Sequence, residues 1–101
     1  MADNGGNVNL EWLQRWYLAQ CNGEWERVRG VTMETLETPG WFVTIDVAET
    51  KWEGSAFAQM HVVRSKTDWL HCTVVEGQFR GEGDAGKLEA ILAVFRNWVE
   101  S

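Results

Sequence analysis

The residues best suited to do chemistry are two histidines, His61 and His71, and the cysteine Cys72 that follows the second. If the segments around them pair as a hairpin, the two imidazoles could lie close together and, with nearby carboxylates, bind a metal or transfer protons. No third ligand stands at a metal-site spacing such as HExxH, and neighbouring residues of a strand point to opposite faces, so His71 is no base for Cys72. Surface or structural histidines and a structural thiol are the favoured interpretation. A small-ligand-binding domain or minor enzyme using the sheet face around His61 and His71 is the alternative.

Other motifs with a chemical meaning are incomplete. The glycine-rich run GQFRGEGDAG (77–86) precedes a helical pattern but lacks the GxxxxGK[ST] of a phosphate loop, and Asp84 at the expected helix start would repel an anion. The paired glutamates of the first half have no neighbours arranged for acid–base catalysis. Two cysteines, Cys21 and Cys72, are too few for a disulfide scaffold or a zinc site, and free thiols in a reducing cytosol are expected. The sequence therefore predicts no catalytic residue, no metal and no cofactor.

Acidic residues concentrate in one part of the chain. The net charge of the 101 residues is −6, and the segment 24–53 holds seven acidic and three basic residues, a net charge of −4. Such a surface repels nucleic acid and anionic membranes and attracts basic partners, although solubility alone would also explain it. Of the three tryptophans in this segment, Trp25 and Trp52 have polar or charged neighbours, and tryptophan is a frequent interface anchor. The candidate partner-binding residues are Glu24, Trp25, Glu26, Glu34, Glu37, Asp46, Glu49 and Trp52.

The elements that must position these residues begin with a helix. Apolar residues recur at spacings of three and four over residues 10–22, with Asn9 as the N-cap and Gly23 as the left-handed residue after the helix. The stripe expected to be apolar consists of Leu10, Leu13, Trp16, Tyr17 and Cys21, and the residues expected to face away are Glu11, Gln14 and Arg15.

The period then changes to two, which indicates strands. Strands are expected at 31–37, 41–47, 56–64 and 68–75, with a brief fifth strand around Phe79. The first two form a hairpin whose Thr38–Gly40 turn is expected to be of type II, with proline at the first central position and glycine at the second.

The last segment predicts a second long helix, capped by Asp84. Its apolar stripe is Leu88, Ile91, Leu92, Phe95, Trp98 and Val99. Because helical and strand patterns do not alternate, the predicted fold is α+β: an antiparallel four- to five-stranded meander sheet flanked by an N-terminal and a C-terminal helix packed on one face. Residues 1–8 are expected to be a flexible tail and 9–101 a single domain. No signal peptide or transmembrane run is visible, so a cytoplasmic location is expected.

Three stretches carry a resemblance to a known family: LEWLQRWYLAQCNGEWE (10–26), ETLETPGWFVTIDV (34–47) and LEAILAVFRNWV (88–99). Together they resemble the immunity protein 53 family, small bacterial proteins encoded beside polymorphic or contact-dependent toxins. The resemblance rests on aromatics and turns, and it implies a cytoplasmic antidote that binds and blocks a cognate toxin domain, with no catalytic residues. If the toxin is a nuclease, its basic active face would suit an acidic antidote. A homodimer through an exposed sheet edge or helix face is compatible with this role.

Overall fold

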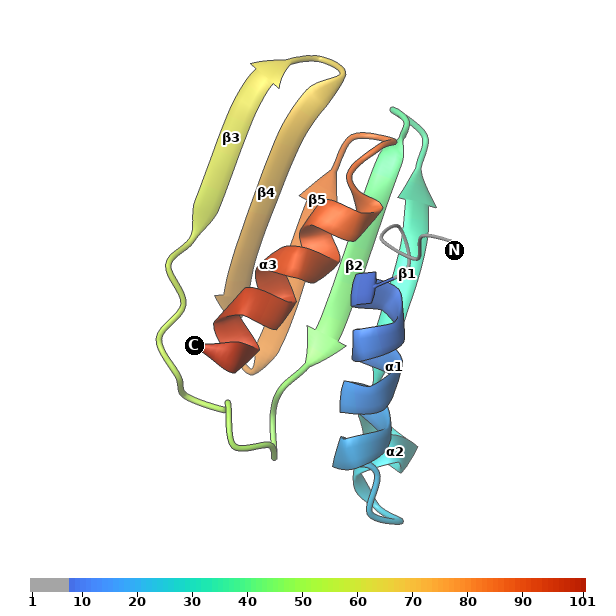
Figure 1. The fold of residues 1–101 in the computed structure, drawn as a ribbon, viewed down its shortest axis with the longest axis vertical. Coiled ribbons are helices and arrows are strands. Elements are labelled where there is room, and N and C mark those ends of the chain that lie inside the picture. The colour runs from blue at the N-terminus through green and yellow to red at the C-terminus, as the bar shows by residue number, and fades with distance from the viewer. Residues whose placement is uncertain (1–7) are drawn as a thin grey trace.

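The computed structural model describes residues 8–101, which form two layers, a five-stranded sheet and the helices that cover it (Figure 1). The helices are α1 (Val8–Gln20), α2 (Trp25–Val28) and α3 (Leu88–Glu100). The strands are β1 (Val31–Leu36), β2 (Gly40–Asp46), β3 (Met60–Ser65), β4 (Asp68–Val75) and β5 (Gln78–Gly83). Every strand pair is antiparallel, and α1 and α3 lie on the same face of the sheet, so the predicted α+β class is confirmed. Val8 already belongs to α1, and the rest of the expected tail lies outside the described residues.

The strand order is β1-β2-β5-β4-β3, which differs from the sequential order of a meander. The chain leaves β2, crosses to the far edge to form β3 and returns through β4, so that β5 becomes the central strand. A Cβ at Gly81 of β5 would meet the Ile91 side chain of α3, and one at Gly83 would lie 2.6 Å from Lys87 Cβ. The glycines that make β5 look like a brief strand are therefore the residues that let α3 approach the centre of the sheet.

The hydrophobic core fills the space between the sheet and the two long helices. The fully buried sheet residues are Val43, Ile45, Cys72 and Phe79, with Val47 just after β2. From α3, Ile91, Leu92 and Phe95 pack onto them as predicted. The Phe95 ring centroid lies 5.0 Å from that of Trp16 in α1 and 5.1 Å from that of Phe79, so one aromatic ring joins both helices to the sheet.

α1 is rotated relative to the orientation expected from its apolar stripe. Leu13 and Trp16 are buried, but Leu10 and Tyr17 are 44% and 36% exposed, so their predicted place in a buried stripe is wrong. The cause is the contact between helices: α1 packs chiefly against α3, and Trp12 turns toward that helix with its ring 5.9 Å from Phe95. The sequence pattern defines an apolar sector of the helix, and the neighbouring helix decides which part of the sector is covered.

Two predicted helix caps are corrected by the structure. Asn9 lies inside α1, where its Oδ1 accepts a hydrogen bond of 3.4 Å from Arg96 of α3. Asp84 does not cap α3, which begins four residues later at Leu88. The Asp84 carboxylate instead accepts hydrogen bonds from the backbone N–H groups of Trp69 in β4 and Gly86 in the loop. Gly23 has the expected positive φ of 95°, in the connector after α1.

The β1–β2 hairpin is confirmed, but its turn differs from the predicted type II turn. The Thr38–Pro39 peptide is cis, and Gly40 pairs with Leu36 as the first residue of β2 instead of taking a positive φ in the turn. A Cβ at Gly40 would lie 2.5 Å from the carbonyl oxygen of Gly83. Glycine is therefore required here by the close approach of β5.

The strand β3 begins at Met60, four residues later than expected. The preceding segment packs under the end of α3: the Phe57 ring lies 5.4 Å from that of Trp98, whose indole N–H donates to the Ala56 carbonyl at 2.8 Å. Ala56 and Phe57 thus contact α3 instead of pairing with β4.

Candidate partner-binding surfaces

The acids predicted to bind a partner do not form one patch. Glu24 is exposed at the start of α2, and Glu49 lies near the same end of the sheet, 3.7 Å from Arg29. Glu34 lies midway along β1 on the sheet face that the helices leave bare, and Glu37 lies in the β1–β2 turn. The predicted residues thus separate into a group beside α2 and a group along β1.

Two of the predicted acids hold the backbone in place. Glu26 accepts hydrogen bonds from the backbone N–H groups of Asn22 (3.0 Å) and Gly23 (2.8 Å), and its pKa is lowered first by its own backbone N–H and then by these two. Asp46 accepts from the Gly30 N–H at 2.8 Å and from the Gln78 side chain at 3.0 Å. Both carboxylates stabilise the approach to β1.

The two predicted tryptophan anchors pack into the interior. Trp25 is 3% exposed, and its indole N–H donates to the Ala48 carbonyl at 3.0 Å. Trp52 is half-buried and donates to the Val99 carbonyl at 3.2 Å, with its ring centroid 5.9 Å from that of Trp16. Trp25 in this conformation presents no side-chain surface to a partner, whereas Trp52 keeps a partly exposed edge over which Lys51 lies.

The histidine pair lies on the bare sheet face, where the register brings it together as expected. His61 of β3 is directly opposite His71 of β4, and their ring centroids are 4.6 Å apart. They end a row across the five strands, Glu34, Phe42, Glu82, His71 and His61. Two concavities of the described residues lie elsewhere, and residues 8–101 contain no group of three side chains placed to hold a metal. Neither of these concavities includes His61 or His71, so neither supports the small-ligand alternative.

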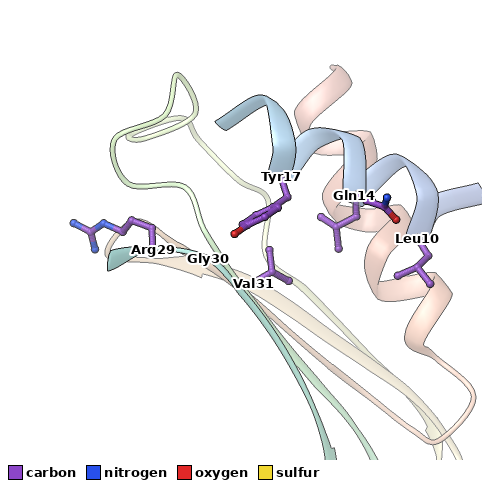
Figure 2. A pocket seen from close by; sticks show the side chains of 7 residues that line it. Leu10, Gln14, Tyr17, Arg29, Gly30 and Val31 are labelled. Carbon is purple, nitrogen blue, oxygen red and sulfur yellow. The ribbon is translucent and has the colours of Figure 1, made fainter. Parts of the chain in front are cut away.

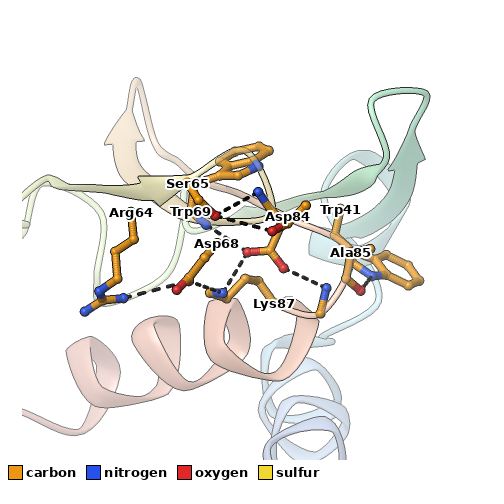
Figure 3. Close-up of polar contacts among 10 residues, drawn as sticks. Trp41, Arg64, Ser65, Asp68, Trp69, Asp84, Ala85 and Lys87 are labelled. Atoms are coloured by element: carbon orange, nitrogen blue, oxygen red, sulfur yellow. Dashed lines mark hydrogen bonds and ion pairs between the residues drawn. The ribbon is translucent and has the colours of Figure 1, made fainter.

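A charged network, not predicted from the sequence, joins β4, β5 and α3 (Figure 3). Lys87 Nζ donates to Asp84 at 2.7 Å and to Asp68 at 2.8 Å, and Asp84 also accepts from the Trp69 N–H at 2.8 Å. The bond from Lys87, followed by that from Trp69, lowers the pKa of Asp84 to about 2. Asp68, followed by Asp84, raises the pKa of Lys87. A concavity of about 410 Å³ beside this network is lined by the turns at the same end of the sheet.

A second concavity lies between α1 and the start of β1, and we call it the α1–β1 groove (Figure 2). It has a volume of about 580 Å³, and its lining residues are Leu10, Leu13, Gln14, Tyr17, Arg29, Gly30 and Val31. Figure 2 shows Tyr17 reaching from α1 toward the strand and Val31 pointing back at it, with Gln14 and Leu10 further along the helix. The sequence carries a signal for this groove: Gln14, expected to face away from the apolar stripe, follows Leu10 by four residues and precedes Tyr17 by three, so the three share one face of the helix.

These features define a small two-layer α+β domain with a bare sheet face, free strand edges and an apolar groove, surfaces that suit protein binding. Residues 10–100 match the family model of immunity protein 53, and the chain belongs to this family. Membership implies a toxin-neutralising role with a toxin protein as the partner. No curated protein and no solved structure matches the chain. Over the described residues, no helix has the length and apolar character needed to cross a membrane.

Proposed function

We propose that this protein is an antidote that binds the toxin domain of its own system and blocks it by occupying its surface. The observation that carries the proposal is the family match over residues 10–100. Binding is the mode of action that fits the structure best, because the residues that could do chemistry, His61, His71 and Cys72, are divided between a bare sheet face and the core.

The acidic character of the segment 24–53 supports a basic partner surface, such as the active face of a nuclease. Within the described residues, the carboxylates of Glu24, Glu34 and Glu37 make no ion pair and no hydrogen bond, so they are free to face a partner. Glu26 and Asp46 contribute negative charge while accepting hydrogen bonds from backbone N–H groups, and Glu49 forms an ion pair with Arg29. The proposed contacts are therefore Glu34 and Glu37 along β1, with Glu24 beside α2 as a separate second group, in a cytoplasmic complex of one antidote with one toxin domain.

The test is neutralisation of the toxin domain encoded beside this gene. Cells expressing that domain should stop growing, and co-expression of this protein should restore growth. Purified protein should abolish the purified domain's activity at a one-to-one ratio, since an antidote that binds with nanomolar affinity titrates its target. An unrelated toxin domain serves as the control. Undiminished toxicity and activity at a clear molar excess would contradict the proposal.

A further inference from the structure

The outer edge of β1 is the starting point, because β1 ends the sheet and pairs only with β2 in the described part of the chain. The Asp46 N–H donates to the Gly30 carbonyl at 3.0 Å, and hydrogen-bonded pairs alternate along an antiparallel ladder. With Val31 opposite Ile45, the N–H and C=O groups of Val31, Met33 and Thr35 point away from β2. The edge therefore presents a row of backbone donors and acceptors at strand spacing.

The α1–β1 groove lies beside this edge. Because α1 packs chiefly against α3, it does not close down on β1, and Leu10 and Tyr17 stay partly exposed above the strand. Met33, on the same face of β1 as Val31, is 36% exposed. A segment added to β1 would thus find backbone partners along the edge and an apolar recess on the helix side.

We propose that the toxin domain docks an extended segment on β1 as an additional strand, with apolar side chains entering the α1–β1 groove and basic side chains on the opposite face beside Glu34. This inference rests on the proposed function and adds to it the docking mode and the chemistry of the docked segment. Alternation of apolar and basic residues follows from the two-residue period of a strand, since one face of the added strand meets the groove and the other meets Glu34.

Charge and geometry favour β1 over the other free edge of the sheet. β3 carries Arg64 and is followed by Lys66, and its register shifts between Val63 and Ser65, an irregularity of the kind that protects an edge from pairing. β1 has a regular register over its whole length and carries Glu34, with Glu37 in its turn and no basic residue between them. Arg64 is paired with Asp68 at 3.8 Å, which partly balances the charge at β3, whereas a basic extended segment meets the carboxylates of Glu34 and Glu37 at β1.

The same charges disfavour a second copy of this chain at β1. Two copies would each bring a net charge of −6, and antiparallel pairing of β1 with itself would gather Glu34 and Glu37 of both chains along one seam. A basic segment of the toxin domain therefore fits the β1 edge better than a second copy of this chain.

The decisive measurement is amide hydrogen exchange, resolved by residue, for the protein alone and in complex with the toxin domain encoded beside this gene. In the complex the N–H groups of Val31, Met33 and Thr35 should exchange at least about tenfold more slowly, because they become hydrogen-bonded. The amides of β3 provide the internal control and should not change. Protection at β3, or at the bare sheet face without β1, would overturn strand addition while leaving neutralisation intact. Failure of the toxin domain to bind at all would overturn both proposals.

Paired variants test the groove and the edge separately. Leu10→Gln should weaken toxin binding about tenfold or more, whereas Leu18→Gln, on the same helix and 71% exposed but outside the groove, should change it less than about twofold. Met33→Pro, which removes an outward N–H, should weaken binding more than Met33→Ala. Equal effects of Leu10→Gln and Leu18→Gln would contradict a groove contact.

A concentration-dependent dimer of the free protein with β1 protected would show that a second copy occupies the edge, and would also overturn the proposal.

Discussion

Cys72 shows how burial decides the chemistry of a single side chain. It is fully buried on the helix face of β4, and burial raises the pKa of its thiol to about 11. The thiolate is the reactive form, so both its absence near neutral pH and its inaccessibility protect Cys72 from alkylation. Cys21 differs because it is only half-buried at the end of α1.

We therefore predict that iodoacetamide at pH 8 modifies Cys72 of the folded protein roughly a hundredfold more slowly than Cys72 of the protein in urea, because modification requires opening of the core. Peptide mass spectrometry separates the two cysteines, and Cys21→Ser removes the faster site. Equal rates for Cys72 in the folded and unfolded protein would show that β4 is not held against the helices as described.

Asp84 is expected to make the stability of the folded protein depend on pH in the acid range. Its folded pKa of about 2 lies below the ordinary aspartate value of 3.8, so the unfolded chain binds the proton more tightly than the folded one. The stabilisation by Asp84 is complete above about pH 4 and is lost as the pH falls from about 4 to about 2. Urea unfolding across this range should show a steeper loss of stability for the natural protein than for Asp84→Asn.

Lys87→Met provides the matched control for this profile, because it removes the first cause of the lowered pKa and keeps Asp84. The acid-sensitive window of that variant should shrink toward the ordinary range of an aspartate. Identical profiles for all three proteins would mean that the Lys87–Asp84 contact does not contribute in solution.

At the scale of the elements, Gly40 distinguishes a turn residue from a packing residue. A Cβ at this position would meet the Gly83 carbonyl of the neighbouring strand, and a backbone atom cannot move aside as a flexible side chain can. Gly40→Ala should therefore destabilise the protein by about 1–3 kcal/mol in urea unfolding, the range of an overpacked site. Gly30→Ala is the control, since a Cβ there has nothing within 4 Å. Equal stability of the two variants would remove the close approach as the reason for glycine.

The elements that the sequence predicts well are those whose own apolar pattern determines which residues are buried. The stripe of Ile91, Leu92 and Phe95 is buried as expected because α3 covers the middle of the sheet and its whole apolar face is in contact. The period-two segments of β2 and β4 were also found, since one face of each strand meets the core. β1 was found as well, although only its two end residues are partly buried.

The elements that were missed depend on partners far away in the sequence. The central place of β5 depends on α3 fitting against Gly81, and the rotation of α1 depends on Trp12 meeting Phe95. The place of Trp25 depends on a distant partner as well: its neighbours in the sequence are charged, whereas a backbone acceptor at Ala48 holds its indole inside. Local sequence records none of these contacts.

For the whole molecule, the position of the helices determines which surfaces are free. α3 covers the centre of the sheet, and α1 packs against α3 on the same face, so the opposite face of the sheet stays bare. The edge at β1 is also left uncovered, because α1 packs chiefly against α3. The acids Glu34 and Glu37 follow that edge and its turn, whereas the basic residues Arg64 and Lys66 lie at the opposite edge. The molecule therefore has an acidic side and a side with basic residues, and a net charge of −6 alone does not describe it.

This asymmetry predicts that the position of charge, beyond its total, controls the association rate with a basic toxin domain. The double reversal Glu34→Lys/Glu37→Lys acts at the β1 edge, and Glu76→Lys/Glu100→Lys acts in the β4–β5 turn and at the end of α3. Each reversal adds two positive charges, so both doubles carry a net −2 instead of −6, and only the location differs. At low salt the β1 double should associate about tenfold more slowly than the natural protein and lose most of its salt dependence, because steering acts through charges near the contact. The other double should slow association by less than about threefold. Stopped-flow measurements at several salt concentrations give both slopes, and equal slowing of the two doubles would move the contact away from β1.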